Sequence, residues 1–151
     1  MNCKCGNIPL RGKDICLSCF LKEDAEKQTK SISHEEDDIQ ECFFNSARVI
    51  FPKLDKLLFA VPNGGKRNYP EAVRLKRQGV RKGVADIICL VPNERYSFLC
   101  METKTDTGTQ LKDQVEFQKQ VEAAGGLYMI YRSAAMGVEI LKDYLSTTKY
   151  K

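Results

Sequence analysis

The run VADIICLV at residues 84–91 constrains the fold of this chain more than any other feature. Its side chains are apolar except that of Asp86. A strand that is apolar on both faces must be covered on both faces, so the run predicts a sheet with helices packed against each side. An ionised carboxylate is costly in such a strand unless it is paired or binds a metal ion. Asp86 is therefore the first candidate for a functional residue.

The rest of the main domain predicts helices and strands that alternate along the chain. Ser33 and Glu36 form a capping-box pattern, and apolar residues then recur at helical spacing up to Pro52. Glycine and proline separate the later segments. We expect an α/β fold with a mixed central sheet flanked by helices. The expected strands are residues 57–61, 84–91, 96–103 and 127–131, and the later helices are residues 69–78, 109–124 and 134–145.

The chain of 151 residues is long enough for one ordinary domain with a small appendage. We predict a cysteine-rich head at residues 1–21, a charged linker or helix at 22–33 and the main domain at 34–148. No apolar run approaches the roughly 20 residues that a membrane-spanning helix needs, so no membrane partner is expected. The N-terminus lacks the apolar stretch of a secretory signal, which favours a cytoplasmic location with reduced cysteines.

Glu102 and Lys104 lie two residues apart in the strand expected after that of Asp86, so both side chains point to one face. If these strands pair as a hairpin, the three residues meet at one edge. Two carboxylates and a backbone carbonyl such as that of Thr103 are hard oxygen ligands, suited to Mg²⁺ or Mn²⁺. Lys104 could then orient or deprotonate a metal-activated water that attacks a phosphate. The alternative is that Asp86 caps a turn while Glu102 and Lys104 form an ordinary ion pair.

Several further motifs favour the metal site over the ordinary ion pair. They are GVRKGVAD at residues 79–86, METK at 101–104, Gly108 and Gln114, preceded by PNGGKR at 62–67 and followed by GLY at 126–128 with Arg132 and Ser133. In this order and spacing the chain resembles the VRR-NUC family of the PD-(D/E)XK nuclease superfamily over residues 33–145. The resemblance implies a restriction-endonuclease-like core and a metal-dependent nuclease activity.

The resemblance also implies a role for each matching residue. Asp86 and Glu102 hold the Mg²⁺ or Mn²⁺ ion, and Lys104 is the catalytic lysine. Gln114 matches a glutamine whose amide could reach the lysine or a metal-bound water. The family usually has proline where Ala85 stands, a departure that should alter backbone stiffness more than chemistry.

A further metal-site glutamate is implied in the first helix. The family pattern places it four residues before a glutamine, which selects Glu36 with Gln40, and Glu35 is the alternative. Glu36 can also be explained as a capping-box acid that the helix dipole favours. Both explanations could hold together.

Positive charge is concentrated just before the candidate metal strand. Residues 53–82 contain nine bases and two acids, whereas residues 22–41 contain eight acids and three bases. Cations there could neutralise phosphates beside a cleavage site and recognise nucleic-acid shape rather than base sequence. An ordinary solvated helix face is the alternative. The candidate DNA-binding residues are Asn63, Gly64, Gly65, Lys66, Arg67, Arg74, Lys76, Arg77, Arg81 and Lys82.

Four of the seven cysteines stand in the first twenty residues, as a C-x-C pair and a C-x-x-C pair. Together they would supply thiolates to a structural Zn²⁺, which would hold a segment without an apolar core. Free thiols and disulfides are the alternatives. The other cysteines, Cys42, Cys89 and Cys100, occur in apolar patterns and are expected in the core. The expected zinc ligands are Cys3, Cys5, Cys16 and Cys19.

We therefore expect a structure-selective endonuclease that cuts branched DNA, at a Holliday junction or a flap, in replication, recombination or repair. Compact members of the family look like virus- or phage-borne enzymes, so the host cytoplasm is the expected location if the chain is phage-encoded. A homodimer would place two sites for paired cuts. Two alternatives stay open: a restriction-like nickase on ordinary duplex, and a zinc-ribbon DNA-binding or adaptor protein with an inactive nuclease core.

Overall fold

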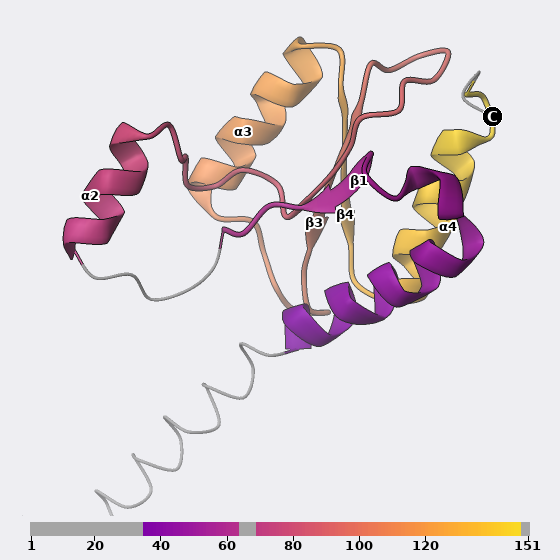
Figure 1. Ribbon diagram of the computed structural model, residues 1–151, viewed down its shortest axis with the longest axis horizontal. Coiled ribbons are helices and arrows are strands. Elements are labelled where there is room, and N and C mark those ends of the chain that lie inside the picture. Colours follow the sequence, from indigo (N-terminus) through magenta and orange to yellow (C-terminus); the bar gives the residue numbers. More distant parts are fainter. Residues whose placement is uncertain (1–34, 64–68, 149–151) are drawn as a thin grey trace, which may run out of the picture. The chain divides into compact units, whose positions relative to one another are not determined.

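The computed structural model describes residues 35–63 and 69–148 of the chain. The chain divides into two compact units, Met1–Asp38 and Ile39–Lys151. The predicted zinc head and the charged linker lie outside the described residues. No helix in the described part is both long enough and apolar enough to cross a membrane. The second unit, shown in Figure 1, carries the sheet and the helices around it.

The described strands form one mixed sheet, which confirms the expected architecture. Its order is β1 (Leu58–Ala60), β2 (Ile87–Cys89), β3 (Leu99–Thr103) and β4 (Leu127–Tyr131). The β1–β2 and β2–β3 pairs are antiparallel, as short connections allow, whereas β3 and β4 are parallel. The parallel pair requires a crossover, and α3 (Lys112–Ala123) supplies it.

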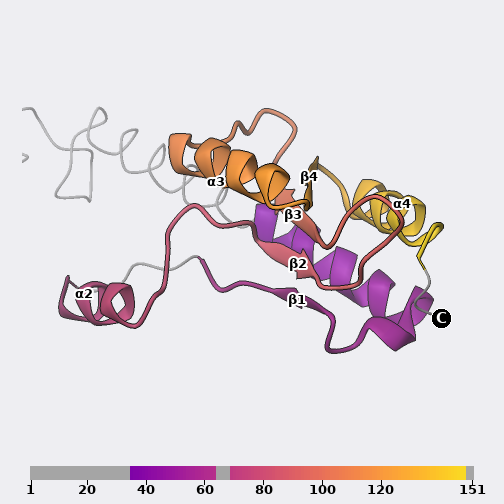
Figure 2. The same ribbon diagram turned by 90° about the horizontal axis from the view of Figure 1, so that it is seen from above.

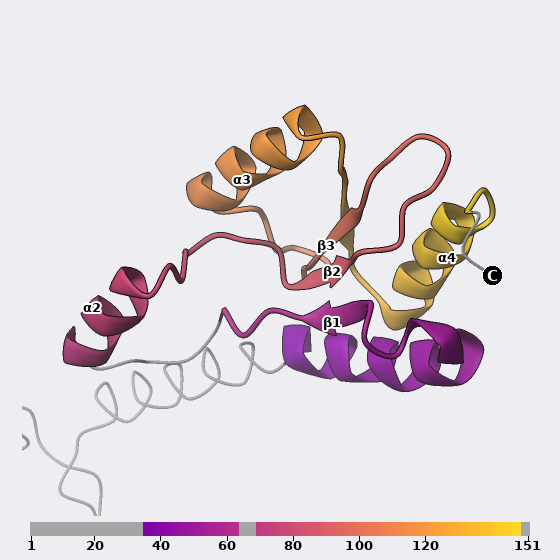
Figure 3. The ribbon, with the colours of Figure 1, turned by 45° about the horizontal axis from the view of Figure 1, so that its top comes forward.

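Helices cover both faces of this sheet, as Figures 2 and 3 show. On one face lie the helix over residues 39–50 and α4 (Ala134–Leu145), and on the other lies α3. A 3₁₀ helix, η1 (Pro52–Leu54), links the first helix to β1. The basic helix α2 (Tyr69–Arg77) ends before Gly79, the predicted helix stop, whose φ of 97° suits glycine.

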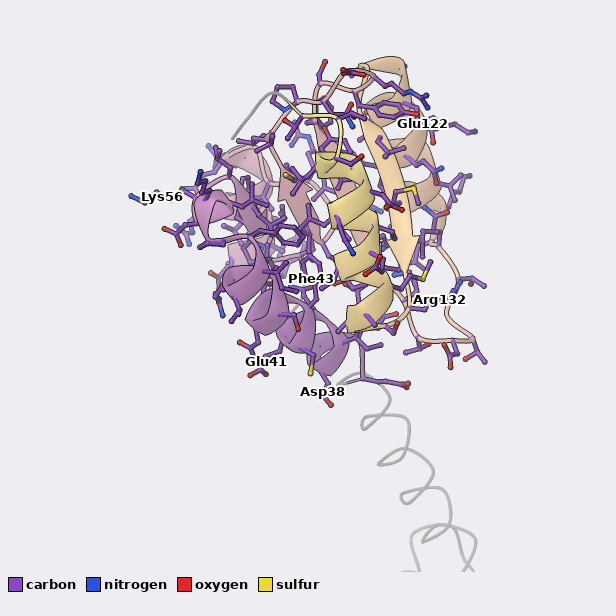
Figure 4. All side chains as sticks on the ribbon, turned by 90° about the vertical axis from the view of Figure 1, so that its right-hand side faces the viewer. Asp38, Glu41, Phe43, Lys56, Glu122 and Arg132 are labelled. Atoms are coloured by element: carbon purple, nitrogen blue, oxygen red, sulfur yellow. The ribbon has the colours of Figure 1, made fainter. Side chains whose placement is uncertain are left out.

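The face covered by residues 39–50 and α4 holds the larger apolar core. Phe43 lies between these two helices, where Figure 4 labels it, and is fully buried against Tyr131 and Leu141. Gly137 lets α4 approach closely, because a Cβ there would lie 2.7 Å from the Phe43 ring and 2.9 Å from the Tyr131 ring. The side chains of Glu102, Lys104 and Tyr128, described below, lie on the opposite face.

Three strand predictions were too long, and the strand expected at residues 57–61 is regular only at Leu58–Ala60. The strand expected at residues 84–91 is regular only at Ile87–Cys89, because its partner β1 is only three residues long. Strand β1 follows η1 closely and cannot extend past Pro62, which has no N–H to donate to the sheet. One hydrogen bond still continues the ladder on each side, from Val61 N to Asp86 O at 2.7 Å and from Leu90 N to Leu57 O at 2.9 Å. Asp86 therefore precedes the strand rather than interrupting it.

The strand expected at residues 96–103 begins at Leu99 instead. Asn93 begins a turn before this strand, since its Oδ1 accepts from the backbone N–H groups of Arg95 and Tyr96, each at 2.8 Å. The helix expected at residues 109–124 begins at Lys112, after a loop that Arg132 holds.

The prediction for Cys42 was wrong. This thiol is exposed, because the helix turns Phe43 and Ala47 toward the core and leaves residue 42 on the solvent side. Cys89 and Cys100 are buried, as expected, and lie on opposite faces of the sheet. Burial raises the pKa of the Cys100 thiol to about 11, so it stays a neutral core residue.

Candidate active site

The β2–β3 hairpin brings Asp86 to the end of β3, as the sequence predicts. Ile87 pairs with Met101, and one further step of the same register puts Asp86 opposite Glu102. The Asp86 carboxylate is fixed there, because its Oδ2 accepts a hydrogen bond from the backbone N–H of Thr103 at 3.0 Å. The hairpin therefore positions the first candidate ligand on the backbone of the second strand.

Alternation along β3 divides its last residues between the two faces of the sheet. Thr103 faces the larger core, where its Oγ1 donates to the Tyr131 hydroxyl at 2.7 Å and lies 3.4 Å from Gln40 Oε1. Glu102 and Lys104 face the α3 side. Gln40, predicted to accompany Glu36, thus contacts Thr103 on the face opposite the two charged residues.

Glu102 is a fully buried carboxylate with donors at both of its oxygens. Its Oε1 accepts from Lys104 Nζ at 2.7 Å and from the Gln114 amide, and its Oε2 accepts from the Tyr128 hydroxyl at 2.9 Å. Burial raises the pKa of Glu102 above 4.5, the Lys104 hydrogen bond opposes this, and the charge of Asp86 raises it further. Two carboxylates whose charges repel each other, one buried and one half-buried, favour a cation between them.

Lys104 already places a cation against these oxygens. Its Nζ is 2.7 Å from Glu102 Oε1 and 3.1 Å from the carbonyl oxygen of Thr103. The side chain is only 8% exposed, so the ammonium is held inside the site. The Glu102 carboxylate and the Thr103 carbonyl therefore converge within reach of one positive charge.

The donor set fits a hard divalent cation. Asp86, Glu102 and the Thr103 carbonyl offer oxygen, the ligand that Mg²⁺ and Mn²⁺ prefer, and Mg²⁺ commonly uses one or two carboxylates with water. Within residues 35–63 and 69–148 there is no cluster of three or more His, Cys, Asp or Glu side chains suited to a metal. Glu36 belongs to the first unit, so its part in the site stays a prediction. The cysteine ligands expected for zinc lie outside the described residues.

Gln114 supports Glu102 rather than Lys104. Its Oε1 accepts from the backbone N–H of Leu111 at 2.8 Å, which satisfies a donor at the start of α3. This bond fixes the orientation of the amide and directs its N–H₂ group at Glu102. One side chain therefore joins the start of α3 to the candidate metal ligand.

Tyr128 is a site residue that belongs to the GLY motif at residues 126–128, but no role in the site was assigned to it from the sequence. It is buried on β4, next to β3, and donates to Glu102 from the side opposite Gln114 and Lys104. Burial, then the charge of Glu102, raises the pKa of Tyr128 well above its ordinary value, so the phenol keeps its proton. The signal was the alternation of residues 127–131, which sets Tyr128 on one face of a strand that pairs with β3.

Arg132 fixes the loop that connects Lys104 to α3. Its Nη1 donates to the carbonyl oxygens of Thr105, of Asp106 at 3.3 Å and of Gly108 at 3.0 Å. Figure 4 shows Arg132 at the end of β4, beside this loop. The resemblance included this arginine, but its contacts came only from the structure.

Part of the predicted basic surface lies within the described residues. Its basic side chains there are exposed on α2 and on the segment that follows α2. Arg74 pairs with Glu71 at 3.5 Å, and Lys82 pairs with Asp113 at 2.7 Å. The amide of Asn63 instead donates to the backbone carbonyl oxygens just before Asp86, the nearer at 2.7 Å. Arg77 and Arg81 are exposed, whereas Gly64, Gly65, Lys66 and Arg67 lie outside the described residues.

The fold is shared with a known protein. A solved structure described as a VRR_NUC domain protein superposes with a TM-score of 0.65 and 21% sequence identity, over 74% of this chain and 88% of that chain. At this identity the likeness establishes the fold and nothing finer. No family model matches the sequence, and no curated protein does.

Proposed function

We propose that this chain is a metal-dependent, structure-selective DNA endonuclease of the VRR-NUC type. The observation that carries the proposal is the convergence of Asp86, Glu102 and Lys104 at one end of the β2–β3 hairpin. Burial of the ionisable pair Glu102 and Lys104 beside the half-buried Asp86 costs stability that apolar residues would not, which is typical of a functional site. The fold shared with a VRR_NUC domain protein supports the same conclusion.

The chemistry follows from the donor set. A Mg²⁺ or Mn²⁺ ion, when bound, would stabilise charge on the scissile phosphate and lower the pKa of a water molecule. Asp86, Glu102 and the Thr103 carbonyl would hold it. Lys104 would direct its N–H donors at the phosphate or at the attacking water. Gln114 and Tyr128 would keep the Glu102 carboxylate in one orientation.

The proposed substrate is branched DNA, such as a Holliday junction or a flap. Exposed cations on and after α2 support backbone contacts, which recognise the shape of DNA rather than its base sequence. A homodimer in the cytoplasm would carry two sites for paired cuts. Replication, recombination or repair, in a phage or its host, is the proposed setting.

The test compares the wild type with Lys104→Ala and with Lys142→Ala, a matched control on the exposed surface of α4. Each protein is incubated with four-way junction, flap, duplex and single-stranded DNA in Mg²⁺, Mn²⁺ or EDTA. We expect the wild type and Lys142→Ala to cut branched DNA only with metal, and Lys104→Ala to be inactive. Equal cleavage by all three proteins would refute the assigned site. Binding without cleavage in every condition would favour the adaptor function.

We also propose that the cysteine-rich head binds a structural Zn²⁺ ion. The support is the sequence pattern of four cysteines in a segment that has little else to stabilise it. Zinc content is measured on the full chain and on the Cys16→Ser/Cys19→Ser variant. We expect one zinc per wild-type chain and its loss in the variant, and unchanged zinc content would refute the proposal.

A further inference from the structure

A groove of about 690 Å³ lies between α2 and α3, outside the residues that contact Glu102. Its apolar lining comes from both walls and from the segment that joins α2 to β2. Figure 3 shows these two helices at the same end of the unit. The apolar lining residues are Ala72, Leu75, Val80, Val84 and Phe117.

The charges around this groove are arranged unevenly. Lys76, Arg81 and Lys82 line the α2 side and are exposed, whereas Asp113 and Glu116 line the α3 side. Lys82 and Asp113 pair at 2.7 Å across its width. A ligand complementary to this groove therefore offers negative charge toward α2 and apolar surface toward the lining.

Two residues of the groove lining are close neighbours, along the chain, of candidate active-site residues. Val84 stands two residues before Asp86, and Asp113 stands next to Gln114, which contacts Glu102. The two walls meet tightly there, because a Cβ on Gly83, whose φ is 73°, would lie 2.5 Å from the Asp113 Cβ. The end of the groove is thus fixed against the site by close backbone packing.

We propose that this groove binds an unpaired DNA strand beside the cleavage site. A single strand presents phosphates along one edge and exposed base faces along the other, which matches a cationic edge and an apolar floor. A duplex presents mainly phosphates, because its bases are stacked on one another. The inference rests on the proposed nuclease function and sharpens it: among branched substrates, it selects flaps with an unpaired arm over junctions whose arms are fully paired.

The first test measures binding in EDTA, so that no cleavage is required. Fluorescein-labelled oligothymidylate and a duplex of equal length are titrated with the wild type, Ala72→Glu and Val73→Glu. Ala72 lines the groove, whereas its neighbour Val73 is exposed on the same helix and does not line it. Both variants add one negative charge to an exposed helical position, and thermal melting checks that both are folded.

We expect Ala72→Glu to weaken single-strand binding about tenfold, because the added carboxylate repels the phosphates and occupies part of the apolar lining, and Val73→Glu to weaken it much less. Duplex binding should change equally in the two variants. Equal single-strand affinity of Ala72→Glu and Val73→Glu overturns the inference and would leave the groove to a protein segment. The inference is also overturned if Ala72→Glu weakens single-strand binding and duplex binding to the same extent.

The second test separates this inference from the proposed function. The same three proteins are given flap DNA and a four-way junction in Mg²⁺ or Mn²⁺. We expect Ala72→Glu to lose flap cleavage relative to junction cleavage, and Val73→Glu to keep the wild-type ratio. If no protein cleaves any DNA while the binding difference persists, the nuclease proposal fails and the single-strand groove stands. An unchanged cleavage ratio in Ala72→Glu overturns the groove but not the nuclease.

Discussion

The two faces of the sheet differ in what they bury. Among the described residues, the apolar core between the sheet and the helices of residues 39–50 and α4 contains twelve buried residues. The core between the sheet and α3 contains four. The charged residues Glu102 and Lys104 occupy the end of the smaller face. One face therefore supplies most of the apolar core, and the other holds the candidate site.

Strand β3 makes this division possible. Its side chains alternate, so Leu99, Met101 and Thr103 face the large core while Cys100 and Glu102 face α3. A change on one face should therefore leave the other largely intact, since side chains on opposite faces share few partners. Four substitutions test this separation.

The largest effect is expected from Asp86→Asn. Asparagine keeps an oxygen for the Thr103 N–H but removes the charge that would hold a metal ion, so cleavage should fall by about 10²–10³-fold or more. The free energy of unfolding should change little. Cleavage rates and urea titrations of one preparation measure both quantities. A variant that loses stability in proportion to activity would contradict the separation of the faces.

The converse change is Leu141→Ala on the large core. Leu141 is fully buried on α4, and truncation of such a side chain lowers the free energy of unfolding by about 2–5 kcal/mol. We expect the folded fraction to cleave DNA with an unchanged kcat. Chemical denaturation and active-site-normalised kinetics at low temperature are the measurements. A large fall in kcat for the folded protein would show that the two faces are coupled.

Tyr128→Phe should give a smaller effect on activity. It keeps the ring beside Phe117 but removes a hydrogen bond to the buried Glu102 carboxylate, which should lower kcat/KM about tenfold. Because that bond favours the ionised carboxylate, its loss raises the pKa of Glu102 and moves the acid limb of the pH profile upward. Tyr131→Phe is the matched control on the other face, where the hydroxyl bonds to Thr103. An identical pH profile in both variants would contradict the role of Tyr128.

The smallest effect is a pH dependence of stability in Glu102→Gln. The pKa of Glu102 is raised in the folded protein, mainly by burial. At pH values between the ordinary pKa of 4.5 and the raised pKa, the folded state therefore keeps a proton on Glu102 that the unfolded state has released. The wild type therefore loses stability as the pH rises through this window, and the variant does not. The stability of Glu102→Gln relative to the wild type should rise with pH. A stability difference between Glu102→Gln and the wild type that stays constant with pH would contradict this.

The sequence was sufficient for the order of elements and for three of the residues that meet in the site. A hairpin joins adjacent strands, so the meeting of Asp86 with Glu102 and Lys104 depended only on local pairing and on alternation. The ends of the strands were harder to predict from the sequence, because the length of β2 depends on its partner β1, which is distant in the sequence. Cys42 was misplaced because the apolar pattern did not define the buried face of its helix sharply enough.

The mixed α/β layering, the basic segment and the acidic pair with its lysine could all be predicted from the sequence, since each depends on residue type and short-range periodicity. Three other features required the folded structure: the hydrogen bonds of Tyr128 and Gln114 to Glu102, the contacts of Arg132 with the loop after Lys104, and the groove between α2 and α3. These contacts join segments that are distant in the chain. Their geometry comes from the parallel β3–β4 crossover and from helix packing, which no local pattern encodes.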